Sequence, residues 1–366
     1  MPGYKILTIN PGSTSTKIAL FLEGEEVFNQ TVEHDGAELA KYQTVCDQLP
    51  YRIETILGVV KAQGVDISDC AAFCGRGGGL NSCCGGTYEV NDQMLAHAKR
   101  GGGNHPAALG CQIAQSFAEK YGARAFIVNP PDVDELCDEA RFTGVAGVYR
   151  EASCHTLNQK ETAIRIAAEM GKKYEDCNFI VAHIGGGVSV AAHKKGRIVD
   201  SNGIINGEGP MAPTRCGAMP VSAVVDMCFS GEYSKDQMKK LLTKSGGFLS
   251  HLGTNDARGV TKMIEEGSSY AALVYSAFQY QIAKSIGAMA AVLDGEVDAI
   301  ILTGGISHDK ALVDNLRKKC GFIAPVMVHA GEFEMEALAA GALRVLRGEE
   351  QALDYTGIPV FAGFDR

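Results

Sequence analysis

The sequence predicts an α/β protein built from two related lobes. The chain has 366 residues, which is long for a single hydrophobic core. A strand–turn–strand–turn–strand pattern occurs twice at nearly one spacing, and strand and helix patterns alternate around the two copies. The copies place the lobes at residues 1–150, joined by a returning segment 337–366, and at residues 151–336.

The first copy of the pattern lies at the N-terminus. Residues 6–9 and 18–21 are apolar or β-branched and predict two strands. The Gly/Ser/Thr segment 10–16 predicts the turn between them, and residues 23–26 predict a second turn into a third strand.

The second copy begins at a strand predicted for residues 179–182. A Gly-rich turn at 183–189 leads to a strand at 190–192, and a turn at 194–197 leads to a third strand. Hairpins are common, so coincidence is the alternative to duplication. The matching order of strands and glycine turns favours duplication.

The remaining segments alternate between helix and strand. Buried strands are predicted at residues 71–74, 125–128 and 299–302. Helices are predicted at 52–63, 107–121, 157–170, 221–229, 234–243, 270–293 and 335–347. We expect Ser153 or Thr156 to cap the helix over 157–170.

Composition narrows the classes of function. The net charge of −9, with no compensating basic stretch, indicates no nucleic-acid partner. No apolar run approaches the roughly 18 residues of a membrane-spanning helix, so we expect no membrane partner. The 12 cysteines include no CxxC pair, which disfavours a zinc site. The start runs into a strand rather than a secretory signal, and free thiols favour a cytoplasmic location.

Three Gly-rich turns are candidates for binding phosphate. Asn10, Ser13 and Lys17 belong to a turn whose amide groups, hydroxyls and lysine suit phosphate oxygens. The turn is no P-loop, because a strand follows it and the GxxxxGK[ST] spacing is absent. An ordinary polar hairpin is the alternative interpretation.

The other two turns each follow a buried strand. His183 precedes three glycines, which let the backbone approach a nucleotide closely. Gly304 and Gly305 form a strand-to-helix turn of the kind that suits a nucleotide. A single buried histidine or a pair of glycines is weak evidence alone.

Two arginines and two histidines are candidates for contacting an anion. Arg76 and Arg215 lie in Gly- or Pro-rich loops and can bind a carboxylate or phosphate through two points. His105 and His155 lie at loop–helix junctions and can donate to a developing phosphoryl charge. Surface ion pairs and helix capping are the alternatives.

These strings together resemble the acetate and butyrate kinase family, whose members are actin-like ATPases with two ribonuclease H-like lobes and a nucleotide cleft between them. The similarity is closest to butyrate kinases and covers essentially the whole chain. It is carried by INPGSTSTK at 9–17, VAHIGGG at 181–187, LTGGI at 302–306 and GEFEMEAL at 331–338.

The resemblance implies a kinase that transfers a phosphoryl group between ATP and a short-chain fatty acid. It implies ATP or ADP and Mg²⁺ as cofactors, an acid or its acyl phosphate as partner, and a homodimer or larger homo-oligomer. Small residues beside Arg76 and His155 favour butyrate or isobutyrate as the acid. In this family the physiological direction is from acyl phosphate to ATP.

The resemblance also implies roles for individual residues. The implied catalytic residues are Arg76, His155, Arg215 and His105. The implied nucleotide-binding residues are Asn10, Ser13, Lys17, His183, Gly185, Gly186, Gly187, Asp256, Arg258, Gly304 and Gly305. The implied magnesium-associated residues are Glu334, for which Glu336 is the alternative, and Asn129.

Asn129 departs from the family pattern, in which the corresponding residue is usually an aspartate. Asn129 is then a neutral partner of a metal-bound water, or Asp132 takes its place, or the enzyme is weakened. A carboxylate substrate is already ionised at neutral pH and needs no general base. An acid kinase therefore tolerates Asn129 better than a sugar kinase, which must deprotonate an alcohol.

Three other functions remain open. An acetate or propionate kinase of the same family is the nearest, and a non-catalytic actin-like ATP-binding protein is the second. A dinucleotide-dependent oxidoreductase is disfavoured, because the turns after the first strand of each copy lead into strands and no G-x-G-x-x-G opens a helix.

Overall fold

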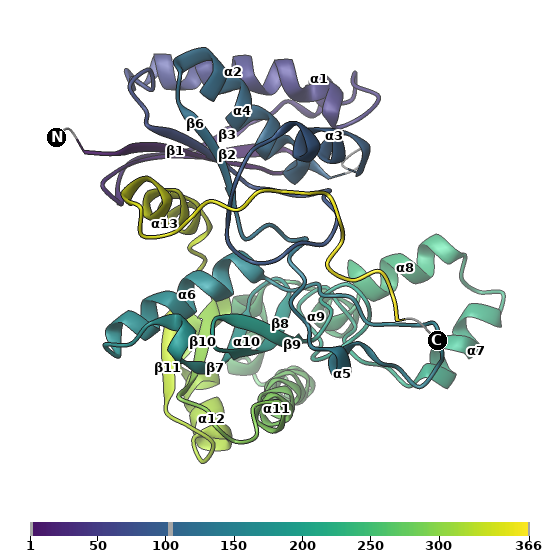
Figure 1. The fold of residues 1–366 in the computed structure, drawn as a ribbon. Coiled ribbons are helices and arrows are strands. Elements are labelled where there is room, and N and C mark those ends of the chain that lie inside the picture. Colours follow the sequence, from purple (N-terminus) through teal and green to yellow (C-terminus); the bar gives the residue numbers. More distant parts are fainter. Residues whose placement is uncertain (1–2, 102–104, 365–366) are drawn as a thin grey trace. The chain divides into compact units, whose positions relative to one another are not determined.

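The structure is a computed structural model that describes residues 3–101 and 105–364. The chain forms two compact units (Figure 1). The first unit comprises Met1–Asp134 and Phe333–Arg366, and the second comprises Glu135–Glu332. The lobe limits expected from the sequence, at 150 and 336, lie slightly further along the chain and stay a prediction.

The first unit contains a six-stranded sheet of order β3-β2-β1-β4-β6-β5. Strand β1 pairs antiparallel with β2 and parallel with β4, and β4 pairs parallel with β6. Its strands are β1 Lys5–Pro11, β2 Ser15–Leu22, β3 Glu25–Glu33, β4 Ala72–Gly75, β5 Thr87–Glu89 and β6 Arg124–Val128. Its helices and 3₁₀ turns are α1 Gly36–Leu39, η1 Cys46–Gln48, α2 Leu49–Ala62, α3 Asp92–Gly101, η2 Pro106–Ala108, α4 Leu109–Tyr121 and α13 Glu334–Arg347.

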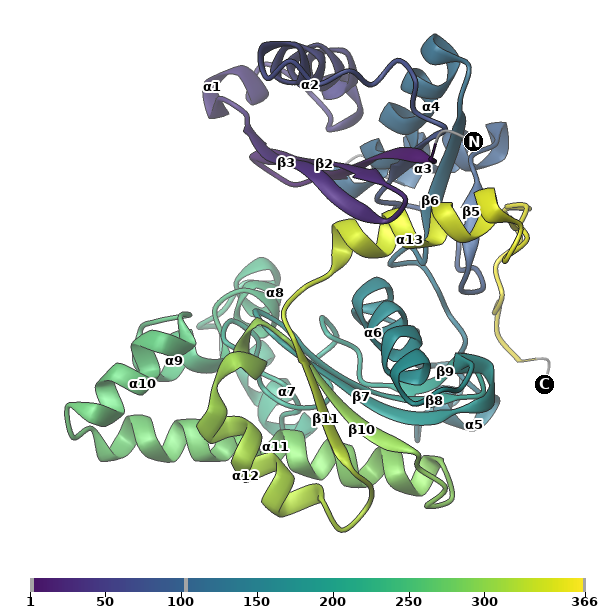
Figure 2. The same cartoon turned by 90° about the vertical axis from the view of Figure 1, so that its left-hand side faces the viewer.

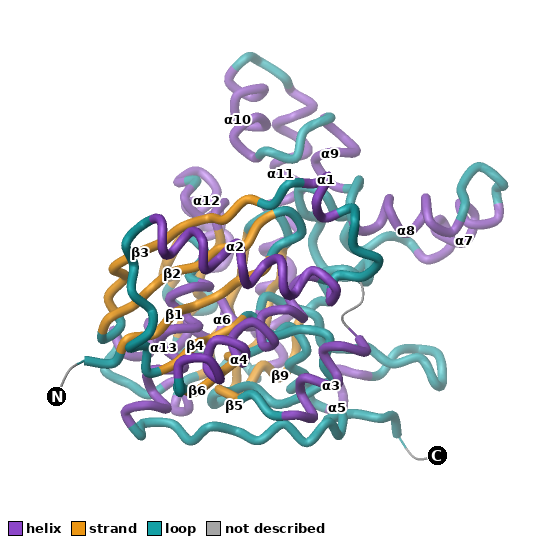
Figure 3. The backbone as a smooth tube through the Cα atoms, turned by 90° about the horizontal axis from the view of Figure 1, so that it is seen from above, coloured by secondary structure: helices purple, strands orange, loops and turns teal. Residues whose placement is uncertain are grey.

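The two faces of the first sheet follow from the period of two along β2. Ile18 and Leu20 belong to a cluster with apolar residues of α2 and α4. Ala19 and Phe21 pack instead with Met335 and Ala339 of α13. Figure 3 looks onto the face that α2 and α4 cover. The returning helix α13 thereby closes the opposite face.

The second unit contains a five-stranded sheet of order β11-β10-β7-β8-β9. Strand β7 pairs antiparallel with β8 and parallel with β10, which pairs parallel with β11. Its strands are β7 Asn178–Ile184, β8 Val188–Lys194, β9 Arg197–Ser201, β10 Ala299–Gly304 and β11 Val326–Ala330. Its helices and 3₁₀ turns are α5 Asp138–Arg141, α6 Thr156–Glu169, η3 Tyr174–Asp176, α7 Val221–Phe229, α8 Lys235–Thr243, α9 Gly247–Leu252, α10 Ala257–Glu265, α11 Ser269–Val292, η4 Gly305–His308 and α12 Lys310–Cys320.

Alternation along β7 also assigns the faces of the second sheet. Ile180 and Ala182 belong to the cluster that contains α11 and α12. Phe179 and Val181 pack with Ala163 and other residues of α6. Figure 2 shows α6 on one side of this sheet and α11 with α12 on the other. His183 has the parity of Phe179 and Val181, so its side chain lies on the α6 face.

The two sheets share one plan, which confirms the predicted α/β fold with two related lobes. In each unit three antiparallel strands, β1–β3 or β7–β9, continue into two parallel strands. Both second meander strands carry a register shift, between Leu20 and Phe21 and between Ala192 and His193. A shared irregularity at matching places supports duplication.

One detail of the sequence prediction is wrong. The N-cap of α6 is His155, and no side chain caps the helix by a hydrogen bond. Thr156 is instead the first helical residue, and its hydroxyl lies 3.3 Å from the thiol of Cys154. No helix in the described ranges is long and apolar enough to cross a membrane.

Candidate active site

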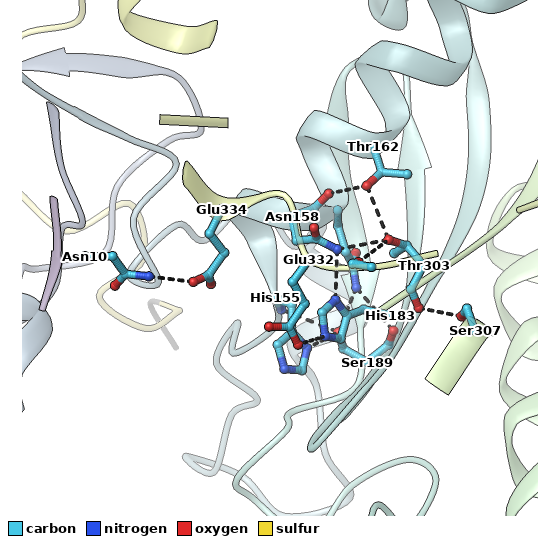
Figure 4. A network of polar contacts seen from close by, with 12 residues as sticks. Asn10, His155, Asn158, Thr162, His183, Ser189, Thr303, Ser307, Glu332 and Glu334 are labelled. Carbon is cyan, nitrogen blue, oxygen red and sulfur yellow. Dashed lines mark hydrogen bonds and ion pairs between the residues drawn. The ribbon is translucent and has the colours of Figure 1, made fainter. Parts of the chain in front are cut away.

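In the first unit, Asn10 and Arg76 meet at Glu334. Asn10 is near the end of β1, and its Nδ2 donates to Oε2 of Glu334 at 2.7 Å (Figure 4). Nη2 of Arg76 lies 3.9 Å from Oε1 of the same carboxylate. Glu334 opens α13, so the packing of that helix on the sheet brings it to β1. Glu334 therefore contacts both Asn10 and Arg76, two residues that the sequence predicted for the site.

The turn after β1 lies over a buried arginine that sequence reasoning missed. Arg52 of α2 has no exposed surface. Its Nη1 donates to the carbonyl of Gly12 at 2.9 Å and to that of Ser15 at 3.3 Å, and its Nη2 donates to the carbonyl of Ser13 at 3.2 Å. Its other partners, Gln48 and Thr16, are neutral, and no acidic side chain pairs with Arg52 in the described residues. The turn thus lies against a cation that has no counterion among the described residues.

Ser13 and Lys17 are both exposed at this turn. Lys17 is on β2, directly opposite Asn10 in the antiparallel register. Its side chain therefore starts from the same end of the hairpin as Asn10.

Asn129 has a structural role at the end of β6. Its φ is 39°, a left-handed conformation that Asn tolerates better than most residues. Its Oδ1 accepts a hydrogen bond from the backbone N–H of Gly86 at 2.8 Å, and its own N–H donates to the carbonyl of Gly86 at 2.9 Å. These bonds explain why an asparagine occupies position 129, because its side chain and backbone hold the local fold. Its role toward a metal stays a prediction.

The charge of Arg76 affects the pKa values of two nearby groups, Asp132 and His105. Burial raises the pKa of Asp132 to about 6, although Leu80 N–H and the charge of Arg76 oppose the rise. Partial desolvation and the charge of Arg76 lower the pKa of His105. Nδ1 of His105 accepts from the N–H of Ala107 at 3.2 Å, so this histidine caps η2.

In the second unit, His183 is buried and hydrogen-bonded at the end of β7. Its side chain is 3% exposed. Nδ2 of Asn158 donates to its Nδ1 at 3.0 Å and to Oγ1 of Thr303 at 3.1 Å (Figure 4). Burial and the charge of Arg215 lower the pKa of His183 to about 4. The ring is therefore neutral at pH 7, and its 3.7 Å approach to Glu332 is not an ion pair.

His155 stacks on His183 at the start of α6. The two ring centroids are 3.9 Å apart and the planes differ by 12°. Nδ1 of His155 lies 2.8 Å from Oγ of Ser189 on β8. Helix α6 and strands β7 and β8 thus position the two imidazoles from separate parts of the sequence.

Arg215 completes this group beside the glycine turn. A Cβ atom on Gly187 would lie 1.8 Å from Nη1 of Arg215 and 3.1 Å from Cε1 of His155. Glycine at 187 therefore makes the room that both side chains occupy. Nε and Nη1 of Arg215 are buried and have no hydrogen-bond partner in the described residues. Burial lowers the pKa of Arg215, but an arginine stays charged at neutral pH.

A partly buried guanidinium with two unused buried donors favours an anionic ligand, because unpaired buried charge is costly. Carboxylates and phosphates match its planar fork.

A cavity of about 780 Å³ opens in the same unit. Four residues predicted to bind the nucleotide line it: Gly186, Asp256, Arg258 and Gly305. Asp256 caps α10 by accepting from the N–H of Arg258 at 3.0 Å. The cavity has the size of small-molecule sites in proteins.

Gly304 shapes the turn at the end of β10. Its φ is 87°, and a Cβ there would lie 2.5 Å from the carbonyl oxygen of Ile184. Only glycine fits, because the backbones of β7 and β10 approach closely at this point. The turn continues into η4 and then α12, the strand-to-helix connection that the sequence predicted.

The structure therefore gathers the predicted residues into two groups, one in each unit. Asn10, Arg76, Asn129 and Glu334 belong to the first unit, and His155, His183 and Arg215 to the second. Within the described ranges, no group of three or more His, Cys, Asp or Glu side chains is arranged to hold a metal ion.

Comparison with known proteins agrees with this architecture. The two sheets and their order define a two-lobed α/β protein of the actin-like fold. The sequence profile of the Acetokinase family matches residues 146–322. This segment, which includes His155, His183 and Arg215, is therefore similar to the Acetokinase family.

Solved structures of similar fold extend over nearly the whole chain. Acetate kinase from Porphyromonas gingivalis has a TM-score of 0.78 at 21% identity, covering 94% of this chain and 100% of that chain. Propionate kinase from Francisella tularensis has a TM-score of 0.71 at 18% identity, covering 92% and 98%. Acetate kinase from Entamoeba histolytica has a TM-score of 0.73 at 16% identity, also covering 92% and 98%. At these identities the similarity establishes the fold.

Several residues around the site escaped sequence reasoning. Arg52 offered a signal, since the buried residues of α2 are Arg52, Ile56 and Val60, at the spacing of one helix face. An arginine within an apolar stripe indicates a buried charge. Asn158 and Ser189 offered none, because their importance depends on packing between distant segments.

Proposed function

We propose that this protein is a carboxylate kinase that transfers a phosphoryl group between ATP and a short-chain fatty acid. The similarity of residues 146–322 to the Acetokinase family supports the class of reaction. The fold similarity to an acetate kinase and a propionate kinase is consistent with it.

The observation that carries the proposal is the guanidinium of Arg215 beside Gly187 and His155, whose buried Nε and Nη1 have no hydrogen-bond partner among the described residues. Bringing one anion against another is the main difficulty when a carboxylate attacks a phosphoryl group. Positioned positive charge and N–H donors supply most of the catalysis in such a transfer. Arg215 and the ring N–H of His155 would bind and orient the phosphoryl oxygens.

The nucleotide would occupy the 780 Å³ cavity with its phosphates toward the glycine turn. Gly186 lines the cavity, and its neighbour Gly187 lies against Arg215, so the cavity and the guanidinium flank the same glycine turn. Asp256, Arg258 and Gly305 would contact the adenosine. Asn10, Ser13 and Lys17 of the first unit stay predicted phosphate contacts, and Arg76 stays the predicted second arginine of the substrate.

The residues of the first unit fit a magnesium ion held mainly by phosphates and water. Mg²⁺ commonly takes only one or two protein carboxylates. Glu334 supplies one, and Oδ2 of Asp132 is buried without a hydrogen-bond partner in the described residues. When bound, Mg²⁺ neutralises charge on the phosphate oxygens. Glu334 would orient a metal-bound water, with Asn10 holding its carboxylate.

No general base is required, because the acid is ionised before it reacts. The amide of Asn129 is engaged with Gly86, which is compatible with a reaction that removes no proton. Direct transfer would break the bond from the leaving oxygen to phosphorus and form one from the carboxylate oxygen to phosphorus.

For the acid, we propose butyrate or isobutyrate. This choice rests on the sequence, in which the small residues Gly77, Gly78 and Gly79 follow Arg76 and Cys154 precedes His155. Pro130 and Ala107 pack against Gly77 and Gly78 in the structure, so the room for a longer tail stays a prediction. The similar structures named as acetate and propionate kinases favour two- and three-carbon acids as the alternative. One methylene in an apolar pocket changes specificity only about 10- to 200-fold.

One assay tests both whether the protein is a carboxylate kinase and which acid it prefers. The purified protein is incubated with ATP, Mg²⁺ and hydroxylamine, and with straight and branched acids of two to five carbons. We expect acyl hydroxamate to form, with the highest kcat/KM for butyrate or isobutyrate. A highest value for acetate or propionate would favour the alternative acid. No hydroxamate with any acid would indicate a non-catalytic ATP-binding protein.

A further inference from the structure

We propose that a buried chain formed by Tyr174, His193, Gln159 and Ser189 fixes the proton of His155 on Nε2. These four are positioning residues, and their value for catalysis rests on the function proposed above. The hydrogen-bonded chain begins in η3 and ends at the ring that stacks on His183, and two secondary-structure elements besides β8, namely η3 and α6, contribute to it.

The orientation of Gln159 anchors the chain. Gln159 has no exposed surface, and its Nε2 lies 3.2 Å from the backbone carbonyl of Ser189 and 2.7 Å from Oγ of Ser189. A carbonyl can only accept, so the amide nitrogen must face Ser189. The reverse orientation would place two acceptors against each other. Oε1 of Gln159 must then face His193.

His193 and Tyr174 agree with that orientation. Nε2 of His193 lies 3.0 Å from Oε1 of Gln159, so Nε2 carries a proton and donates it. Burial lowers the pKa of His193 well below its ordinary value, so the ring is neutral and Nδ1 accepts. The hydroxyl of Tyr174 donates to Nδ1 at 2.7 Å, and burial raises the pKa of Tyr174 so that it keeps its proton.

The hydrogen-bonding capacity of the Ser189 hydroxyl then determines the tautomer of His155. Oγ of Ser189 receives one hydrogen bond from Nε2 of Gln159 and a longer one, 3.4 Å, from the backbone N–H of His155. These donors use both of its lone pairs. Its own hydrogen is left for Nδ1 of His155, 2.8 Å away. Nδ1 therefore accepts, and the proton of the neutral ring is on Nε2.

Every hydrogen bond in the chain points toward His155. Such aligned bonds polarise one another, which strengthens the last donor. The chain also removes the choice between tautomers, so His155 presents an N–H at one defined atom. A histidine with the wrong tautomer cannot donate from that atom, whatever its position.

The tautomer is measured directly by ¹⁵N NMR of histidine-labelled protein at neutral pH, with the His155 signals assigned by a His155→Asn variant. The wild-type protein is expected to show a protonated Nε2 and an unprotonated Nδ1. In Ser189→Ala the fixed tautomer should give way to a mixture. A wild-type signal with the proton on Nδ1 would overturn the proposal, and so would an unchanged tautomer in a folded Ser189→Ala protein.

Kinetics supply the second arm. Ser189→Ala is expected to lower kcat roughly 10- to 100-fold, as loss of a supporting hydrogen bond does elsewhere, with little change in KM for ATP. Ser189→Thr, which keeps the hydroxyl, should restore most of the activity. Thr8→Val is the matched control, because it removes another buried strand hydroxyl, bonded to the carbonyl of Ala19 at 3.2 Å. An equal loss of activity in Thr8→Val would contradict the assigned role.

Gln159→Met is an independent variant should Ser189→Ala fail to fold. It removes one donor to Ser189 and leaves the strand unchanged, and it should also release the tautomer. The two arms separate the inference from the proposed function. A protonated Nε2 in a protein that makes no acyl hydroxamate would refute the function alone. A protonated Nδ1 in an active kinase would refute the inference alone.

Discussion

The turn after β1 and the turn after β7 occupy matching places in the two sheets, yet they are built differently. The first is rich in hydroxyl side chains and has its carbonyls bound by the buried guanidinium of Arg52. The second is made of glycines, and its space is taken by Arg215 and His155. In the first turn the arginine binds the backbone carbonyls, whereas in the second turn the arginine lies beside the glycines.

This difference indicates a division of labour between related hairpins. A cation bound to backbone carbonyls cannot also grip a ligand with the same N–H groups, so Arg52 supports its turn and adds positive potential. A cation with unused N–H groups can bind a ligand directly, so Arg215 suits the reacting phosphoryl group. The same fold plan thus provides a supporting arginine in one unit and a binding arginine in the other.

Replacing the binding arginine should have the largest effect. Arg215→Ala is expected to lower turnover in the hydroxamate assay about 10²- to 10³-fold, as loss of one transition-state donor does in other enzymes. Arg317→Ala is the matched control, since Arg317 is half-exposed on α12 of the same unit and forms an ion pair with Asp314. Equal turnover in the two variants would remove Arg215 from the reaction.

Replacing the supporting arginine should act mainly on stability. Arg52→Met leaves the carbonyls of Gly12, Ser13 and Ser15 without this donor, at about 1 kcal/mol or more for each. The free energy of unfolding, measured in urea, is expected to fall by about 3 kcal/mol. Arg124→Met, which breaks an exposed pair with Glu89, should cost only about 1 kcal/mol or less. Similar losses in both variants would contradict the supporting role.

Filling the space in the second turn should disturb the binding arginine without unfolding the protein. The Cβ of Gly187→Ala would overlap Nη1 of Arg215, which is the far end of a flexible side chain and can move. Turnover is expected to fall about 10-fold, corresponding to roughly 1.4 kcal/mol, with an unchanged melting temperature. Gly287→Ala in α11 should leave turnover unchanged, because nothing in the described residues beyond the adjacent helix backbone lies within 4 Å of the new Cβ.

Lowering the pH should reduce the stability of the protein through His34, a buried histidine near Arg52. Burial and the charge of Arg52 lower the pKa of His34 to about 4, and its Nε2 lies 2.8 Å from Oγ1 of Thr16. The unfolded chain takes up a proton below about pH 6.5, whereas the native His34 does not. The resulting stabilisation is complete above pH 6.5 and is lost as the pH falls toward 4.

His34→Gln should therefore weaken the dependence of stability on pH between 6.5 and 4 by roughly 1.4 kcal/mol per pH unit. Urea unfolding of wild type and variant at several pH values measures this difference. Asp132 acts in the opposite direction, because its raised pKa lets the native state bind a proton below about pH 6. That contribution is common to both proteins and cancels in the comparison. Identical slopes would show that His34 is not buried in its neutral form.

Much of the fold was readable from sequence because the signals are local. Period-two strands and glycine turns repeat in order, and the helix over 221–229 has the predicted bounds. Other elements were missed: the three-residue strand β5 is too short for a clear period, and α3 is polar along much of its length. Strand β11, whose residues are all partly buried, was missed as well.

The residues of the candidate site likewise fall into those that the sequence predicts and those that only the structure identifies. Residues in Gly-rich strings, such as His183 and Gly187, were found because the strings themselves are distinctive. Gln159 and Tyr174 belong to no motif, and only the packing of α6 and η3 against β8 gives them partners. Arg52 carried a signal in its helical spacing with Ile56 and Val60, but a charge interrupting an apolar face is easily taken for a surface residue.

The most direct measurement is the Nε–H resonance of Arg215 in ¹⁵N-arginine-labelled protein, assigned by an Arg215→Lys variant. If this guanidinium holds the reacting phosphoryl group, adding butyryl phosphate and Mg²⁺–ADP should shift the resonance and slow its exchange with water. An unchanged resonance at concentrations that support full turnover would contradict that role.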